Sequence, residues 1–522
     1  MQSRLVLATA CAAAGLIAVP SSQAAPHAVA SPAADCRARI AGLDLETATI
    51  ADLRAALAAG RLTSAQLVSA YLARIKAYDR PTNSIRELSP TAMKWAAKLD
   101  AERKSGRIRG PLEGVPVLLK DNIGTEDQPT TAGSIALAGM RPRRDATLVA
   151  RLRAAGAIIL GKTNLSEFAN WVDLSMPNGY SSLGGQVREA YSLGDPSGSS
   201  SGSGVAGSMA FAAAAFGSET SGSILSPSSV NGLVGIKPTR GLVSRDGIIP
   251  LAEGFDTAGP MARDVADAAA LLTVVAATDA ADPATANANS HKTDYVNAIE
   301  GATLRGVRLG YSASVRDGLT APEQVVYKRA LADLTKAGAV LVATDALDNT
   351  GNIGLVELGL IPNDFKANLD HYLATYAPTP KSGVKSLLDI VIYNNGHKDK
   401  VKYGQNLLIA SAAQPGEATT ASVGSLAMRT AQGANIDQGL GKDHLDAFIA
   451  PGAAYANIGA SAGYPTVVVP SGLVSDIHPL GLSFMGTAWS EAKLLRYAAA
   501  YESATKRRVP PTVVNADLLK HC

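Results

Sequence analysis

The sequence predicts a single α/β domain, and three observations lead to this fold class. Segments with the apolar spacing of helices alternate with short, continuous apolar runs that are typical of buried strands. The 522 residues are 47% hydrophobic and 18% charged, which is enough apolar material for a large core. The chain shows no internal repeat and no long linker. One domain is therefore expected, although length alone would allow about two to four.

The first 24 residues are expected to be a secretory signal. Arg4 precedes an apolar run from Leu5 to Val19, and Ser22-Gln23-Ala24 offers small residues for cleavage, with a later alternative at residue 30. The run is short for a membrane span, so an anchor is the weaker interpretation. The domain at 31–522 is then predicted to be secreted, extracellular, free of the membrane and monomeric.

Removal of the signal would also remove Cys11 and leave Cys36 and Cys522. A pair of cysteines can close a bridge in an oxidising compartment. Because the termini of compact domains often lie near one another, we expect a disulfide between Cys36 and Cys522. The alternative is two unrelated free thiols.

The elements follow from the spacing of apolar residues and from turn and cap residues. Thr63 or Ser64 can cap the second helix. Helices are expected over residues 51–62, 63–78, 90–103, 149–155, 205–216 and 490–507. Strands are expected over 114–120, 157–162, 234–238, 446–451 and 466–470, the last two stopped by proline. Residues 276–292 are expected to form a surface loop, and 345–440 mix helices with polar loops.

Composition excludes several classes of partner. The net charge is +3 without a long charged block, and only 5% of residues are aromatic, so no nucleic-acid or anionic membrane partner is expected. The seven histidines never show the i, i+4 spacing of a helical metal site. We expect neither a metal nor an organic cofactor.

A Gly/Ser-rich segment at 198–207 fits two motifs by its letters. Gly198-x-Ser200-x-Gly202 fits a nucleophile elbow, and Gly202-x-Gly204-x-x-Gly207 fits a dinucleotide fingerprint. Both motifs need a preceding strand, whereas residues 191–196 form a turn. A flexible linker would stay polar, but this segment enters an apolar stretch. A second Gly/Ser turn at 218–223 follows, so the two turns indicate a folded site with close backbone approach.

Six motifs together resemble the amidase signature family. They lie at 114–122, 161–164, 198–203, 217–224, 231–239 and 259–261. The signature core spans about residues 110–265, and weaker similarity extends from about 45 to 508. Within the family, the triple serine 199–201 and the segment 243–250 are most similar to bacterial peptide amidases.

The resemblance implies a mixed, twisted β-sheet covered by helices and a Ser-Ser-Lys triad. Ser223 matches the nucleophile, Ser199 the bridging serine held by a cis peptide bond, and Lys120 the base. A serine hydroxyl needs a base, and lysine can be one only when neutral. Lys120 follows the uncharged run 114–119, where burial would disfavour its ammonium form, although the adjacent Asp121 could favour the charge.

The turn before Ser223 is suited to bind an oxyanion. We expect backbone N–H groups of Thr220, Ser221, Gly222 and Ser223 to form the hole, because a tight glycine turn can point successive amides in one direction. Ser200 is expected to support the turn by hydrogen bonding, or else to be a solvated turn serine. A histidine-based triad is disfavoured, and His371 and His397 are expected at the surface.

Three positions depart from the family pattern and bear on substrate preference. Ser221 replaces a common glycine or aspartate, Leu225 a common arginine, and Ser197 one glycine of a pair. The predicted function is a secreted serine amidase that converts carboxamides, with C-terminal peptide amides the leading substrate, to carboxylate and ammonia. Alternatives are an amidase or esterase for aryl or fatty substrates, and a non-catalytic secreted binding protein. Components of tRNA-dependent amidotransferases share the signature, but the export signal argues against them.

Overall fold

The computed structural model describes residues 39–348, 350–351, 353–377, 380–515 and 518. The predicted export signal and the predicted disulfide between Cys36 and Cys522 lie outside the described residues. All elements of secondary structure belong to one compact unit, residues 37–522.

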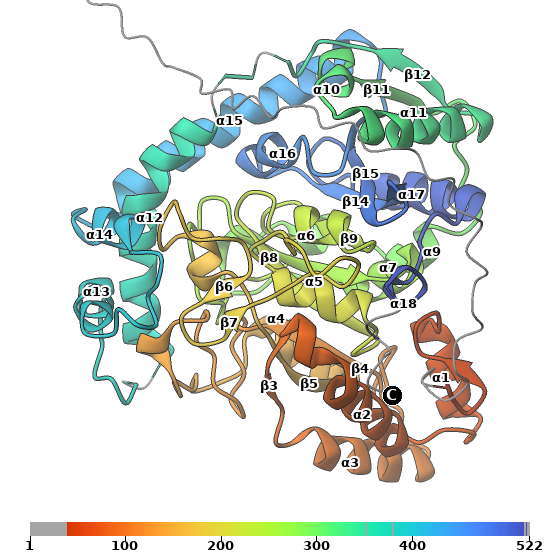
Figure 1. Ribbon diagram of the computed structural model, residues 1–522. Helices are drawn as coiled ribbons and strands as arrows, with labels where there is room; N and C mark the ends of the chain where they lie inside the picture. The colour runs from red at the N-terminus through yellow and green to blue at the C-terminus, as the bar shows by residue number, and fades with distance from the viewer. Residues whose placement is uncertain (1–38, 349, 352, 378–379, 516–517, 519–522) are drawn as a thin grey trace, which may run out of the picture. The chain divides into compact units, whose positions relative to one another are not determined.

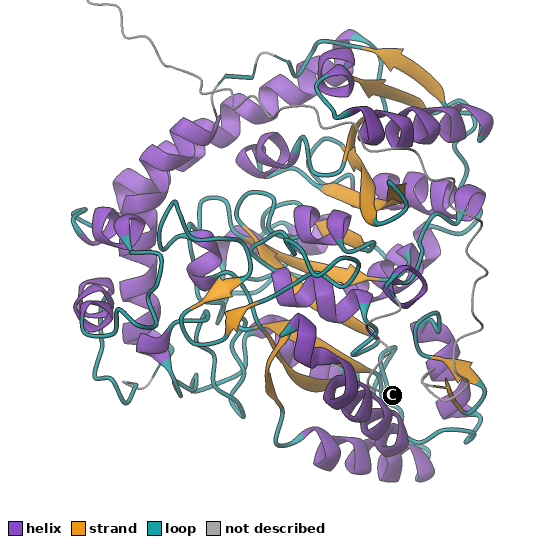
Figure 2. Cartoon of the chain, in the orientation of Figure 1, coloured by secondary structure: helices purple, strands orange, loops and turns teal. Residues whose placement is uncertain are grey.

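An eleven-stranded mixed sheet forms the centre of this unit (Figure 2). Its strands, in spatial order, are β12 (Val340–Ala343), β11 (Arg308–Tyr311), β13 (Ala447–Pro451), β15 (His478–Met485), β14 (Thr466–Val474), β9 (Val234–Lys237), β10 (Thr257–Ala262), β8 (Ala214–Glu219), β4 (Pro116–Lys120), β5 (Ile158–Thr163) and β3 (Ile85–Leu88). β8, β4 and β5 run parallel, whereas β10 is antiparallel to β8 and to β9. The predicted mixed sheet is confirmed.

Helices surround the sheet in Figure 1. They are α1 (Ile50–Ala58), α2 (Ser64–Thr82), α3 (Ala92–Lys104), α4 (Thr147–Ala154), α5 (Ser201–Ser208), α6 (Leu225–Val230), α7 (Val265–Val275), α8 (Ala288–His291), α9 (Tyr295–Ala298), α10 (Ala313–Asp317), α11 (Ala321–Lys336), α12 (Ile353–Thr375), α13 (Leu387–Asn395), α14 (Asn406–Ala412), α15 (Ala418–Lys442), α16 (Ala456–Ala462), α17 (Glu491–Thr505) and α18 (Pro511–Val514). Short 3₁₀ turns lie at Ile135–Leu137, Glu167–Asn170 and Pro283–Thr285, and two-stranded ribbons pair β1 (Arg39–Ile40) with β2 (Leu43–Asp44) and β6 (Tyr180–Ser181) with β7 (Gly185–Gln186). Across the part of the chain that the structure describes, no helix is long and apolar enough to cross a membrane.

Capping explains where the first helices begin. The Thr49 side chain accepts from the Asp52 N–H, and Asp52 reciprocates at the Thr49 N–H. Thr63 and Gln66 form the same reciprocal box at α2. Each box satisfies two helix-end donors, so the predicted helices begin where the sequence places caps, with Thr63 rather than Ser64 as the cap.

The prediction of one helix over residues 205–216 is wrong. Residues 201–208 form α5, and the following alanine-rich stretch turns and becomes strand β8. Every residue of β8 is buried, and Phe216 pairs with Leu119 on one side and Pro260 on the other. A short apolar run buried on both faces carries no period that separates helix from strand.

Three smaller expectations also need correction. β14 continues past Pro470 to Val474 because the strand bulges between Pro470 and Gly472, which accommodates the missing N–H. The expected loop at 276–292 contains the turn Pro283–Thr285 and the short helix α8. The last long helix, α17, ends at Thr505, and α18 follows it.

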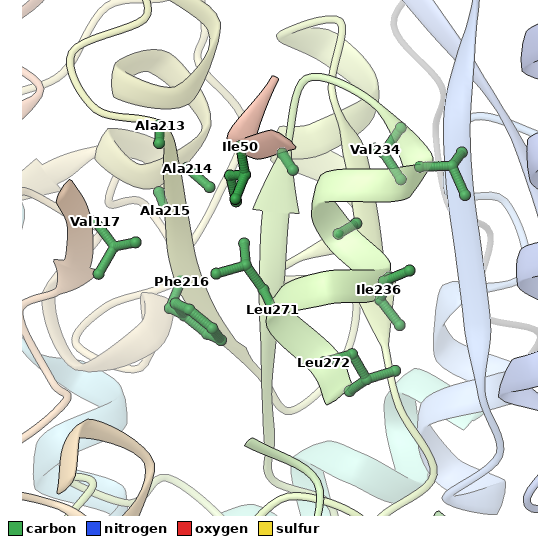
Figure 3. Close-up of a cluster of buried hydrophobic side chains, with 14 of the residues drawn as sticks. Ile50, Val117, Ala213, Ala214, Ala215, Phe216, Val234, Ile236, Leu271 and Leu272 are labelled. Carbon is green, nitrogen blue, oxygen red and sulfur yellow. The ribbon is translucent and has the colours of Figure 1, made fainter. Parts of the chain in front are cut away.

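Figure 3 shows how apolar side chains fix the central strands. Phe216 of β8 lies beside Leu271 of α7, with Val117 of β4 on one side and Ile236 of β9 on the other, all fully buried. This packing holds β4 and β8 side by side as parallel strands, so their carboxyl ends meet at one edge of the sheet. Lys120 and Ser218 lie at these ends.

Candidate active site

Lys120 is the last residue of β4 and is fully buried. Its Nζ lies 2.8 Å from Ser199 Oγ, 3.0 Å from Ser218 Oγ and 3.1 Å from the Ser218 carbonyl oxygen. Asn122 steadies this arrangement by donating from Nδ2 to Ser218 Oγ at 2.9 Å. The three oxygen partners fix the amine of Lys120 toward Ser199.

The carboxylate of the adjacent Asp121, which was expected to favour the charged form of Lys120, is directed elsewhere. Asp121 forms its ion pair with Arg86, whose Nε lies 2.5 Å from the carboxylate. Successive residues of an extended chain point to opposite sides, which separates the Asp121 side chain from that of Lys120. Burial lowers the pKa of Lys120 to about 7, while Asp256 and Glu219 act in the opposite direction. A large neutral fraction is therefore present at neutral pH, as a base requires.

Ser199 lies at the start of the first Gly/Ser turn and is fully buried. The peptide bond between Gly198 and Ser199 is cis. The Ser199 carbonyl oxygen accepts from the Ser166 N–H at 3.1 Å. A Cβ on Gly198 would lie 2.6 Å from Ser166 Oγ, so a side chain there would push this segment away.

The second Gly/Ser turn joins β8 to α6 and carries Ser223. Gly222 has a φ of +84°, which favours glycine, and Ser223 is 7% exposed. The Ser223 carbonyl oxygen accepts from the Ser200 N–H at 3.2 Å, which ties the two turns together. The structure thus brings the turns that carry Ser199 and Ser223 into direct contact beside Lys120.

Side chains around this turn hold its shape. The Thr220 hydroxyl donates to Asp256 at 2.5 Å, and the Ser221 hydroxyl donates to Asn457 Oδ1 at 3.0 Å. Buried Glu219 accepts from the N–H groups of Ile224 and Leu225 at 2.7 and 3.0 Å. Glu219 thereby fixes the segment that directly follows Thr220, Ser221, Gly222 and Ser223, the residues predicted to form the oxyanion hole.

Ser200 is fully buried rather than solvated. Its hydroxyl donates to the Ser218 carbonyl at 3.1 Å and accepts from the Ser218 N–H at 3.3 Å. These contacts fit the expectation that Ser200 supports the turn.

Sequence reasoning missed Ser218 and Asp256. Ser218 lies within the second turn, and Asp256 precedes the motif at 259–261. Nothing in the sequence around them indicates that Ser218 binds Lys120 or that Asp256 binds Thr220. The Asp256 carboxylate accepts from the N–H groups of Leu251 and Ala252 as well as from Thr220. Burial raises the pKa of Asp256 to about 6. Asp256 thereby links the turn of Thr220 to the segment at 251–252.

A narrow cavity of about 30 Å³ opens beside Ser218 and Thr220. Apolar residues such as Ala132, Phe168 and Ile249 form about half of its walls, and polar or charged residues, among them Arg245, Glu253 and Asp256, form the rest. A concavity that combines apolar walls with placed polar groups is the usual form of a small-molecule site.

His371 and His397 lie away from this cluster, on α12 and in the turn after α13. His371 is exposed, whereas His397 is half-buried, stacked on Tyr393 and hydrogen-bonded to its carbonyl oxygen at 2.8 Å. Within the described ranges, no group of three or more His, Cys, Asp or Glu residues could hold a metal ion.

Known proteins similar to this chain include amidases. A family model described as "Amidase" matches residues 66–495. A probable amidase of Arabidopsis thaliana is 37% identical over 484 residues, which cover 90% of this chain and 92% of the relative. A putative amidase of Schizosaccharomyces pombe is 35% identical over 511 residues, covering 90% and 87%.

Solved structures show the same architecture. The native peptide amidase from Stenotrophomonas maltophilia is 44% identical with a TM-score of 0.83, and the match covers 89% of this chain and 98% of that one. An amidase family protein from Bacillus anthracis is 35% identical with a TM-score of 0.84, covering 90% and 92%.

Proposed function

The chain belongs to the amidase family, and on this premise we propose that it hydrolyses carboxamides through an acyl-enzyme, with Ser223 as nucleophile, Ser199 as proton relay and Lys120 as base. The observation that carries the proposal is the 2.8 Å contact between a fully buried lysine and Ser199. Because burial lowers the pKa of Lys120 to about 7, its neutral amine can accept a proton.

In the first half-reaction, Ser223 Oγ attacks the amide carbonyl carbon. Its proton passes to Ser199 Oγ while the Ser199 proton passes to Lys120 Nζ. The N–H groups of Thr220, Ser221, Gly222 and Ser223 stabilise the oxyanion. The carbon–nitrogen bond then breaks, and the proton returns through Ser199 to the departing nitrogen, which leaves as ammonia.

The second half-reaction repeats the proton path with water. Water attacks the acyl carbon and gives its proton through Ser199 to Lys120. The bond to Ser223 Oγ breaks, the proton returns to that oxygen, and the carboxylic acid product leaves and loses its remaining proton to solvent as the carboxylate. No group beyond the three side chains and the oxyanion turn is needed to balance these steps.

C-terminal peptide amides are the leading substrate in this proposal. Support comes from the triple serine 199–201 and from the 44% identity to a peptide amidase. Ammonia release from a panel of peptide amides, aryl amides and short aliphatic amides tests it. We expect the largest kcat/KM for peptide amides. Preference for aryl or fatty amides would contradict this substrate, and hydrolysis of no amide would favour the binding-protein alternative.

We further propose that the mature protein is an exported monomer with a bridge between Cys36 and Cys522. The support is the signal-like N-terminus and the pair of cysteines that remains after its removal. Thiol titration of the denatured, unreduced mature protein should find no free thiol in a monomer. Two free thiols would contradict the bridge.

The pH dependence of kcat/KM should report the titration of Lys120. Only the neutral amine can act as base, so activity should fall with decreasing pH, with a midpoint near the Lys120 pKa of about 7. Asp256 raises that pKa, so Asp256→Asn should move the midpoint to lower pH. If the titration of Asp256 itself caused the loss of activity at low pH, Asp256→Asn would abolish that loss. Full activity at about pH 4, near the pKa of ordinary carboxylic acids, would contradict a lysine base.

A further inference from the structure

A second, larger cavity adjoins the narrow one beside the oxyanion turn. It has a volume of about 370 Å³, compared with about 30 Å³ for the first. The two cavities share Arg245, Ile248, Pro250 and Glu253 as lining residues. The narrow cavity is too small for a whole peptide amide, so a substrate that enters it needs further space. The second cavity lies next to it and has the size of typical ligand pockets, roughly 300–1,000 Å³.

The walls of the second cavity come from three parts of the chain. One is the segment 245–250, another is the turn at 281–283, and the third is the C-terminal half of α12, including Ala367, Asn368 and His371. α12 belongs to the region whose order the sequence left undefined. The cavity therefore lies outside the motifs that carry the proposed chemistry, although it shares lining residues with the narrow cavity beside the oxyanion turn.

Most charges in this cavity are paired. Arg245 donates to both carboxylate oxygens of Asp282, at 2.5 and 2.9 Å. Asp246 accepts from Arg144 at 2.5 and 2.8 Å and from the Tyr376 hydroxyl at 2.5 Å. Each of these ion pairs brings one positive and one negative charge, so together they leave the cavity without net charge.

Glu253 is a charged residue of this cavity that takes part in neither ion pair, and it lines both cavities. Its side chain is exposed, and among the described residues no lysine, arginine or histidine nitrogen lies within salt-bridge distance of its carboxylate. Arg245 attracts it from further away. The main chain at this point is held in place, because the Glu253 carbonyl oxygen accepts from Arg240 at 2.9 Å and from Arg245. The backbone that carries this carboxylate is thus held at the junction of the two cavities.

We propose that the second cavity receives the part of the substrate remote from the scissile amide, and that Glu253 selects peptide amides with an ammonium group there. This proposal rests on the proposed amidase function. An extended peptide advances by about 3.3–3.6 Å per residue, so one or two residues carry the chain from the narrow cavity into the next. The free α-ammonium group of a short peptide amide then reaches the junction at Glu253.

The test compares kcat/KM for a dipeptide amide with a free amino terminus, the same compound after N-acetylation, and a single amino-acid amide. For the wild type we expect the kcat/KM of the free dipeptide amide to exceed that of the acetylated one about two- to fivefold, the size of an exposed ion pair. Glu253→Gln should bring this ratio close to one. Glu300→Gln removes an exposed carboxylate elsewhere and should keep the wild-type ratio.

A second variant tests the cavity independently of charge. Ala367→Trp places a large side chain in the second cavity and should lower the ratio between the dipeptide amide and the single amino-acid amide severalfold. A wild-type ratio of one between free and acetylated dipeptides, or an unchanged ratio in Glu253→Gln, would overturn the role of Glu253. An unchanged length preference in Ala367→Trp would overturn the role of the cavity. If the protein hydrolyses peptide amides but gives these negative results, only the proposal about the second cavity and Glu253 is wrong. If it hydrolyses no peptide amide, the proposed amidase function is wrong as well.

Discussion

We expect Ser223→Ala to lower kcat by about 10⁴-fold or more, because the members of a catalytic unit act together and none replaces the nucleophile. Ser199 is fully buried with its hydroxyl bound to Lys120, whereas Ser223 is 7% exposed, so Ser223 is the better placed of the two to attack a substrate carbonyl. The variant removes one oxygen from a small side chain in a turn, and the fold should persist. Ammonia release under single-turnover conditions and the thermal midpoint measure the two effects.

Ser200→Ala is the matched control for this substitution. Ser200 lies in the neighbouring turn, and its hydroxyl binds the carbonyl and N–H groups of Ser218. Loss of these hydrogen bonds should cost about 1 kcal/mol each and reduce activity about tenfold. If Ser200→Ala abolished activity while Ser223→Ala kept it, the nucleophile-elbow interpretation of Gly198-x-Ser200-x-Gly202 would be correct.

Lys120→Met should lower kcat by about 10³-fold or more, because the proton of the nucleophile then has no acceptor. Methionine has a similar length and no charge, so it suits a fully buried position and should preserve the fold. Lys120→Arg should be equally inactive, since arginine keeps its positive charge at every accessible pH and cannot act as base.

Ser218→Ala is the control for Lys120. It removes one of the oxygen atoms near Nζ but leaves the amine and its contact with Ser199. We expect a loss of tenfold or less, measured as kcat at a pH well above 7. Near wild-type activity in Lys120→Arg would contradict the assignment of a neutral lysine base.

The central strands and the first helices could be predicted because local signals agree there with the fold. Thr63 supplies a cap, and the apolar run before Lys120 has the length and continuity of a buried strand. The boundary between α5 and β8 could not be predicted, because Ala214 and its neighbours are buried whichever structure they adopt. In the region 345–440, contacts between distant helices decide the arrangement of α12 and α15.

The site was predictable in part. Family resemblance, not spacing, indicated Lys120, Ser199 and Ser223 together, since 79 residues separate Lys120 from Ser199 in the chain. The partners that tune the site are long-range as well, because Asp256 meets Thr220 only through the pairing of β8 with β10. Because Asp121 follows Lys120 directly, its carboxylate was expected to favour the charged form of the lysine. Side chains alternate along an extended chain, however, and the Asp121 carboxylate pairs with Arg86 instead.

The central claim, that Ser223 is the nucleophile of a Ser-Ser-Lys unit, is tested most directly by covalent labelling. A phosphonate probe that reacts with activated serine hydroxyls is incubated with the protein, and the labelled residue is identified by peptide mass mapping. We predict one label, on Ser223, that does not form in Lys120→Met, where the hydroxyl is not activated. A label on Ser200 or Ser199, or equal labelling of Ser223 in Lys120→Met, would contradict the claim.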